Sequence, residues 1–159
     1  RLLRTGAAIP EPVLRKHRPG RGAAVNLEAQ DKRSLSDLRM AKAQEFLEDA
    51  QANVREGRHK TGVNRAYYAA LSAIRSLLIL EGSNPETHEG VVTMLSLRFV
   101  KPDLLPVAFV KSFKLLQSRR ADVDYGDIDT IGPEDAADAV RTAEEMIRQA
   151  EKVREALLP

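Results

Sequence analysis

The sequence predicts an all-α protein that folds as an up-and-down bundle of about five helices. Apolar residues recur at helical spacing in several long segments, and no segment alternates apolar and polar residues as a half-buried strand does. Short stretches rich in Pro, Gly and Asp separate these segments, which favours neighbouring antiparallel helices. With 43% apolar and 30% charged residues in a chain of 159, we expect one ordinary globular core.

The first part of the chain differs from the rest. Residues 1–33 contain three Pro and three Gly and show no helical period, so we expect an extended or disordered arm followed by a bundle over residues 34–159. Residues 1–32 hold seven Lys or Arg against three acidic residues, whereas the remainder holds eighteen against twenty. A basic arm could contact nucleic acid or an acidic partner, although a solvated tail is the simpler interpretation.

The first two helices are the longest periodic segments. The first is expected at 36–56, with Ser34 or Ser36 as its N-cap. The second is expected at 62–81 and carries the widest apolar face, ending before Gly82, which suits a C-terminal cap. Its periodicity indicates that it is the central helix.

Three more helices follow. Thr87 is a suitable N-cap for a helix that ends near residue 100, and the Lys-Pro-Asp sequence after it breaks the period. A fourth helix runs from about residue 105 to Gly126, with Pro106 in its first turn. Pro133 followed by two acidic residues predicts the start of a last helix over 133–157.

Composition excludes several classes of site. The chain has no Cys, so it has no disulfide, thiolate metal site or cysteine nucleophile. Phosphate-binding Gly-Lys loops and metalloprotease motifs are absent, and His17, His59 and His88 lack a second ligand at helical spacing, so each is expected at the surface. We therefore expect no metal or cofactor. No apolar run is long enough to cross a membrane and no signal segment opens the chain, which predicts a cytoplasmic protein.

One polar cluster lies in the second helix. Asn64, Arg65 and Tyr68 share one edge of that helix at spacings of three and four, while Tyr67 points into the apolar stripe. In a purely structural interpretation, Tyr67 fills the core and Arg65 pairs with an acid.

A second polar cluster lies at the end of the fourth helix. It contains Arg119, Arg120, Asp124 and Tyr125, and an Arg there also complements the helix dipole and can pair with Asp124. If the two clusters face one another across a groove, the arginines suit a phosphate-bearing ligand, because guanidinium groups bind phosphate in bidentate fashion.

These motifs together resemble the HEPN family (higher eukaryotes and prokaryotes nucleotide-binding domain), in its small stand-alone prokaryotic branch. Four motifs in the family order carry the resemblance: Asn64-Arg65-Ala66-Tyr67-Tyr68-Ala69-Ala70, Thr87-His88-Glu89-Gly90, Phe99-Val100-Lys101, and Arg120 with Asp124-Tyr125-Gly126. The resemblance implies a dimeric helical bundle that is often the toxin partner of a minimal nucleotidyltransferase antitoxin.

The resemblance also bears on catalysis. Many HEPN domains are metal-independent ribonucleases whose motif is an Arg followed four to six residues later by a His. Here Arg120 or Arg119 matches the Arg, while Val123, Asp124 or Tyr125 stands where the His would be. A Tyr with a pKa near 10 is a poor general base at neutral pH. In some members a tyrosine beside the motif accepts nucleotidyl groups, and Tyr125 matches that position.

Three functional hypotheses follow. The favoured one is a dimeric HEPN protein that binds a nucleotidyltransferase and a nucleotide or RNA phosphate, without the usual Arg/His ribonuclease activity. Its candidate binding residues are Asn64, Arg65, Tyr68, Arg119, Arg120, Asp124 and Tyr125. The alternative is a metal-independent endoribonuclease that uses Arg120 and Tyr125 at a dimer cleft. In the third hypothesis the bundle is only a scaffold, and the basic arm binds the nucleic acid.

Overall fold

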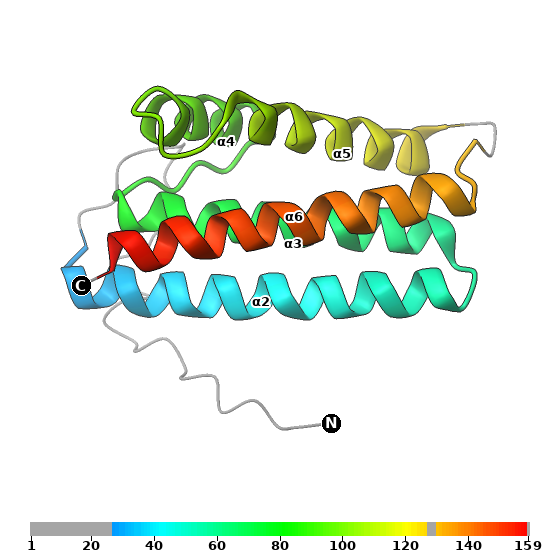
Figure 1. Ribbon diagram of the computed structural model, residues 1–159, viewed down its shortest axis with the longest axis horizontal. Coiled ribbons are helices and arrows are strands. Elements are labelled where there is room, and N and C mark those ends of the chain that lie inside the picture. The colour runs from blue at the N-terminus through cyan, green and yellow to red at the C-terminus, as the bar shows by residue number, and fades with distance from the viewer. Residues whose placement is uncertain (1–26, 127–129, 159) are drawn as a thin grey trace.

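The chain folds into a bundle of helices (Figure 1). The computed structural model describes residues 27–126 and 130–158, and within these ranges it contains helices and no strand. This confirms the all-α prediction. The helical elements are α2 (Ala29–Arg55), α3 (His59–Leu80), α4 (His88–Leu95), the π turn η1 (Ser96–Val100), α5 (Val107–Tyr125) and α6 (Pro133–Leu157).

The helices form two layers around α3. α2, α3 and α6 pack against one another, and α4, η1 and α5 form a second layer that rests mainly on α3 (Figure 1). The most strongly periodic segment is therefore the central helix, as predicted. No helix in the described part of the chain combines the length and the apolarity needed to cross a bilayer.

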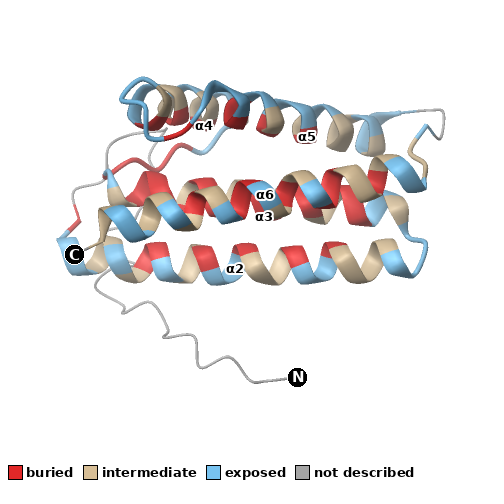
Figure 2. Ribbon diagram, in the orientation of Figure 1, coloured by how far each residue is buried: buried red, intermediate tan, exposed pale blue. Residues whose placement is uncertain are grey.

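The two layers are packed with different residue types. Where α2, α3 and α6 meet, the buried faces are rich in alanine: Ala43, Ala50, Ala66, Ala69, Ala70, Ala73, Ala136, Ala139, Ala143 and Ala150. The second layer instead buries three aromatic side chains, Phe99, Phe109 and Phe113. Because the distance between packed helices depends on the side chains at the contact, alanine lets the first three helices approach closely. Figure 2 shows the resulting buried stripe along α3 and α6.

The first helix begins earlier than predicted. α2 starts at Ala29, so residues 29–33 of the predicted arm are helical, and neither Ser34 nor Ser36 caps it. Ser36 is fully buried instead, and its hydroxyl donates to the Ser76 carbonyl at 2.7 Å. The extra turn is anchored by a small apolar cluster of Leu27, Leu35 and Ile79. Residues 1–26 of the predicted arm lie outside the described residues.

The start of α2 and the end of α6 lie side by side at one end of the bundle (Figure 1). Arg154 of α6 donates through Nε to the Ser36 hydroxyl at 2.8 Å and forms an ion pair with Asp37. Arg154 and Ser36 are 118 positions apart in the chain.

The remaining helix boundaries agree with the prediction to within a few residues. Thr87 caps α4, and its hydroxyl accepts a hydrogen bond from the Gly90 amide at 2.9 Å. Pro106 lies just before α5, as its N-cap, rather than inside the first turn. α6 begins at Pro133 as predicted, and the carboxylate of Asp135 accepts from the Gly132 amide at 3.0 Å.

Candidate functional site

The polar cluster at the junction of the two layers is built around Arg120 of α5. Its guanidinium carbon lies 5.1 Å from the centre of the Tyr67 ring and 5.3 Å from that of Tyr68, both on α3. Both distances are within the range of cation–π attraction. Nη2 forms an ion pair with Asp124 at 3.2 Å, and Nη1 lies 3.4 Å from the amide oxygen of Gln117. The cation is thus held in place by two tyrosine rings and two polar neighbours.

The guanidinium of Arg120 is partly accessible. Its side chain is 23% exposed and that of Asp124 is 28% exposed. An ion pair at this depth is weak because water and salt screen it, so a more highly charged anion such as a phosphate could replace the carboxylate. The geometry therefore suits recognition of a phosphate.

Tyr67 of α3 contacts both Arg120 and the buried ring of Phe113 on α5. It is 3% exposed, and its ring stacks on that of Phe113 with 5.5 Å between centroids. Burial raises the pKa of Tyr67, and the positive charge of Arg120 opposes the rise. The tyrosine is therefore protonated at neutral pH, and its hydroxyl oxygen shares a hydrogen bond with Nδ1 of His88 at 3.2 Å.

His88 is the first residue of α4 and was predicted to be an ordinary surface side chain. It instead stacks on Phe113 with 4.7 Å between ring centroids. Burial lowers the pKa of His88 below its ordinary 6.5, Glu89 raises it, and the charges of Arg120 and Lys114 lower it further. The imidazole is therefore neutral at pH 7, beside a fixed positive charge.

The polar edge of α3 that was predicted from Asn64, Arg65 and Tyr68 faces α2 more than α5. The guanidinium of Arg65 lies 5.6 Å from the Phe46 ring of α2. Tyr68 also contacts Phe46, at 5.9 Å between centroids, so it connects the Arg65 side of α3 to the Arg120 side. Asn64 is half-buried on the same helix.

The other predicted residues of α5 point away from the cluster. Arg119 faces α6, where it donates to the Asp135 carbonyl at 2.7 Å and pairs with Asp138 at 3.0 Å. Tyr125 is 81% exposed, and among the described residues no polar or ring contact joins it to Arg120. The two clusters predicted from the sequence therefore meet where Arg120 contacts Tyr67 and Tyr68. Arg65 and Tyr125 do not contribute to this contact.

Residues 27–126 and 130–158 contain no group of three or more His, Asp or Glu side chains that could hold a metal ion. The groups that are assembled are a guanidinium, two phenols and an imidazole, which can bind an anion and exchange a proton.

Comparison with known families identifies the domain. The model of the HEPN domain matches residues 36–153, about three-quarters of the chain. The chain belongs to the HEPN family. The resemblance drawn from the four motifs is therefore confirmed.

Relatives of this HEPN domain include a bacterial and an archaeal protein. A UPF0332 protein of Thermotoga maritima is 28% identical over 127 residues, which cover 80% of this chain and 96% of the relative. A protein of Methanocaldococcus jannaschii named "Putative toxin MJ0142" is 28% identical over 99 residues, covering 62% of this chain and 67% of the relative.

A solved structure shares the fold of this HEPN domain. The crystal structure of TT1696 from Thermus thermophilus aligns with a TM-score of 0.65 at 18% identity, covering 74% of this chain and 97% of that one. At this identity the likeness concerns the fold alone.

Sequence reasoning missed the role of one member of the cluster. His88 was expected at the surface, although it stands in one of the four motifs, whereas the buried position of Tyr67 was predicted correctly. The signal that was available is the N-cap at Thr87, because a cap fixes the next residue in the first turn of α4. Nothing in the sequence, however, indicated that this turn packs on Phe113.

Proposed function

We propose that this protein is the HEPN member of a toxin–antitoxin-like pair and that it recognises a phosphate of RNA or of a nucleotide at Arg120. The name "Putative toxin MJ0142" of the archaeal relative supports the first part. The second part rests on the position of Arg120. Its guanidinium is held over the rings of Tyr67 and Tyr68, and its ion pair with Asp124 is partly exposed to solvent.

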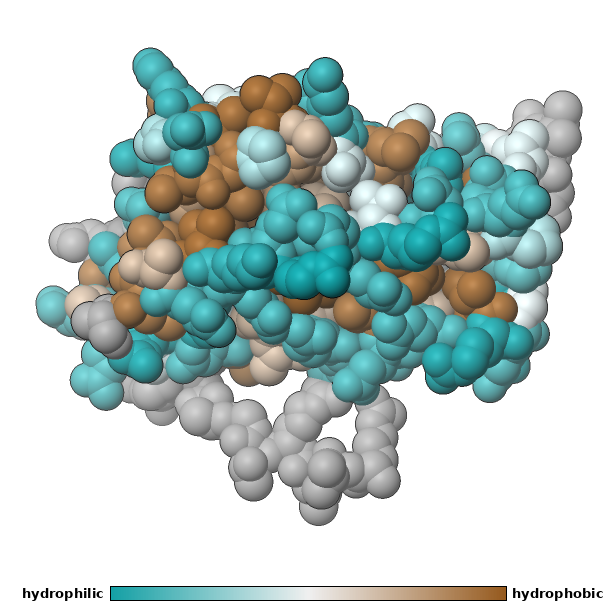
Figure 3. All heavy atoms as spheres, in the orientation of Figure 1, coloured by the Kyte–Doolittle hydropathy of each residue, from teal (hydrophilic) through white to brown (hydrophobic). Residues whose placement is uncertain are grey.

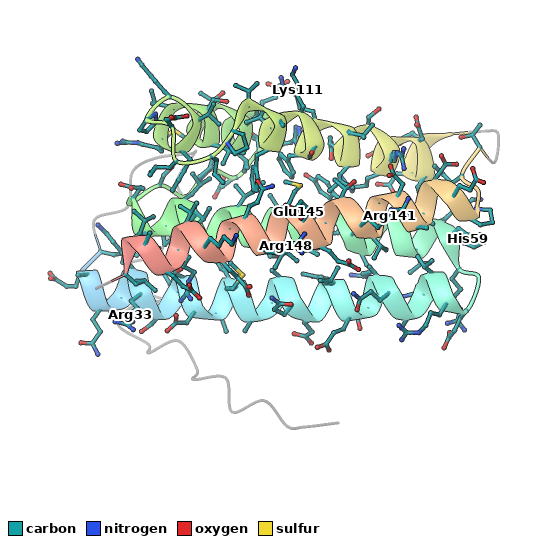
Figure 4. All side chains as sticks on the ribbon, viewed as in Figure 1. Arg33, His59, Lys111, Arg141, Glu145 and Arg148 are labelled. Atoms are coloured by element: carbon teal, nitrogen blue, oxygen red, sulfur yellow. The ribbon has the colours of Figure 1, made fainter. Side chains whose placement is uncertain are left out.

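Further positive charge lies on the same helix. Lys114 and Lys111 are exposed on α5, about one and two-thirds turns and about two and a half turns before Arg120. Figure 4 shows Lys111 projecting from the outer side of α5, away from α6. At about 3.6 residues per turn, Lys111 lies on nearly the opposite side of α5 from Arg120, whereas the charge of Lys114 reaches His88 and lowers its pKa. A nucleic-acid phosphate bound at Arg120 would therefore also be attracted by Lys114, so the affinity should fall with salt.

Binding is tested with a short fluorescent single-stranded RNA, and with ATP, in equilibrium titrations. Arg120→Ala should weaken binding by about tenfold or more, since a charge-assisted hydrogen bond contributes about 1.5–3 kcal/mol. Arg141→Ala is the matched control, because Arg141 is an exposed arginine on α6 that already pairs with Asp138. Equal losses in the two variants, or no binding by the unaltered protein, would contradict the proposal.

The proposed partner is a minimal nucleotidyltransferase, and Tyr125 is the proposed acceptor of its nucleotidyl group. The phenol of Tyr125 is 81% exposed, whereas that of Tyr67 is buried. In such a transfer the tyrosine oxygen attacks the α-phosphorus of a nucleoside triphosphate, diphosphate leaves, and the phenolic proton passes to solvent.

Co-expression with a minimal nucleotidyltransferase from the same organism tests the partnership. The two proteins should purify together, and mass spectrometry should show a nucleotidyl adduct that disappears in Tyr125→Phe and persists in Tyr68→Phe. Failure to purify together, under conditions in which both proteins are soluble, would count against this part of the proposal.

We also propose that the protein is a cytoplasmic dimer that pairs through the second layer. Four exposed large apolar side chains lie on η1, on the loop after it and on α5: Leu97, Leu104, Val107 and Leu115. Figure 3 shows apolar side chains gathered over this part of the molecule, and exposed apolar area of this kind often marks an interface. Light scattering should give a dimer that Val107→Lys and Leu115→Lys together convert to a monomer.

A further inference from the structure

His88 has one ring nitrogen in a fixed contact and the other open. Nδ1 is hydrogen bonded to the Tyr67 hydroxyl. Nε2 makes no hydrogen bond within the described residues, and it is not among the buried atoms that lack a partner, so it faces solvent. The ring cannot turn freely, because one of its faces stacks on Phe113 at 4.7 Å.

The residues around His88 come from three helices. α4 supplies His88, α3 supplies Tyr67, and α5 supplies both Phe113 and Arg120. Tyr67 contacts both His88 and Arg120, and the charge of Arg120 also reaches the imidazole, where it lowers the pKa. One tyrosine therefore links an acid–base group to a phosphate-binding group, although 32 positions separate the two groups in the sequence.

We propose that His88 is the acid–base residue of an RNA-cleaving site in which Arg120 holds the phosphate at the point of cleavage. This inference rests on the proposed function, because it uses the same phosphate contact at Arg120. It assigns the proton transfer to α4, rather than to α5, whose residues after Arg120 contain no histidine.

The proposed reaction is a transesterification that needs no further reactant. Nε2 of His88 accepts the proton of the ribose 2′-hydroxyl, and the 2′-oxygen attacks the adjacent phosphorus. The bond from phosphorus to the 5′-oxygen breaks, the electron pair leaves with that oxygen, and a proton returns to it from the imidazolium. The products are a 2′,3′-cyclic phosphate and a 5′-hydroxyl. Arg120 stabilises the additional negative charge that develops on the phosphoryl oxygens.

Tyr67 is assigned as a positioning residue. For Nε2 to act as a base, the proton of the neutral ring must be on Nδ1, which then donates to the hydroxyl oxygen of Tyr67 at 3.2 Å. Because burial raises the pKa of Tyr67, the phenol stays protonated, and its hydroxyl oxygen remains a neutral acceptor over the whole neutral pH range. The contact thus sets both the tautomer and the direction of the ring.

The first experiment measures single-turnover cleavage of a short RNA and, in parallel, the affinity of each variant for the same RNA. His88→Gln should slow cleavage by about a hundredfold or more and leave RNA affinity unchanged, because general acid–base catalysis contributes about that much. His59→Gln is the matched control, since His59 is also in the first turn of a helix and lies at the end of the bundle where α2 joins α3 (Figure 4). A substrate with a 2′-deoxy sugar at the cleaved position should stay intact.

The outcomes separate the two proposals. If the unaltered protein binds RNA through Arg120 but does not cleave it, or if His88→Gln cleaves as fast as the unaltered protein, the role of His88 is refuted and the proposed phosphate binding stands. If Arg120→Ala leaves RNA affinity unchanged, the proposed function itself fails. Unchanged RNA affinity in His88→Gln also shows that the variant is folded.

The second experiment is a pH–rate profile, which a purely structural role of His88 would not affect. Glu89 on α4, Tyr67 on α3, and Lys114 and Arg120 on α5 are the titratable or charged groups near His88. Cleavage should fall at acidic pH with a midpoint below 6.5, the ordinary pKa of histidine. Tyr67→Phe should shift this midpoint and Tyr68→Phe should not. A profile without an acidic limb would overturn the inference.

Discussion

The two helix contacts that flank α3 are packed in opposite ways. On one side α2 and α6 meet α3 through alanine, and the backbones come close together. On the other side the second layer buries Phe99, Phe109 and Phe113, which are larger, and Phe113 stacks on Tyr67 of α3. The cluster of Arg120, Tyr67 and His88 lies only on the second side. Large side chains hold two helices far enough apart to leave space for a guanidinium and an imidazole between them, which closely packed alanines do not.

The aromatic side should be most sensitive to loss of volume. Phe113→Ala is expected to lower the free energy of unfolding by about 3–5 kcal/mol, because it removes a fully buried ring and leaves a cavity under Tyr67 and His88. Chemical denaturation measures this. Lys111→Ala is the control on the same helix, since Lys111 is exposed and lies outside the proposed dimer interface. Similar losses in the two variants would show that the aromatic layer does not support the helices.

The alanine side should be most sensitive to added volume. Ala70→Leu is expected to cost about 1–3 kcal/mol, because the residue is fully buried and the neighbouring helices must move apart to admit a larger side chain. Ala41→Leu, on the exposed side of α2, provides the comparison and should be nearly neutral. If Ala70→Leu were also neutral, the close approach of the three helices would not depend on alanine.

The pH dependence of stability should come partly from the aromatic side. The pKa of folded His88 is lower than the 6.5 of the unfolded chain, so the unfolded state binds the proton more tightly. The contribution of His88 to stability is therefore fully present above pH 6.5 and is lost as the pH falls through the folded pKa. Denaturation at a series of pH values should show this loss, and His88→Gln should reduce it. If His88→Gln lost more stability at acidic pH than the unaltered protein, folding would raise the pKa of His88 rather than lower it.

The smallest effect on stability is expected at the surface of the cluster. Asp124→Asn removes the ion pair with Arg120, in which the two side chains are 28% and 23% exposed, and should change stability by less than about 1 kcal/mol. RNA affinity should rise, because the guanidinium no longer has a competing carboxylate. Asp138→Asn, which affects Arg119 instead, should leave affinity unchanged. Weaker RNA binding in Asp124→Asn would show that the carboxylate orients Arg120 rather than competes.

The fold could be predicted from the sequence because each helix carries its own signal. Apolar spacing located all five helices, and local chemistry located several ends, such as Thr87 before α4 and Pro133 at the start of α6. The start of α2 was missed because Ser36 has the chemistry of an N-cap, yet its hydroxyl is used in a contact with Ser76 on α3. A local pattern cannot distinguish a hydroxyl that caps its own helix from one that bonds to a neighbouring helix.

The site was only partly predictable for the same reason. Arg120 and Asp124 are four apart on one helix, so their pairing follows from helical spacing alone. The contacts of His88 with Tyr67 and Phe113 join three separate helices and depend on how the layers pack. Periodicity gave the buried position of Tyr67 but no indication of which helix would cover it.

The pairing of Arg154 with Ser36 and Asp37 places the beginning and the end of the bundle next to one another. When the two ends of a domain are adjacent, a short linker can join them, and new termini can be created at another position in the chain. The exposed turn at Gly57, between α2 and α3, is a suitable position for the new opening. The same adjacency would let residues 29–157 be inserted into a surface loop of another protein with little displacement of the host.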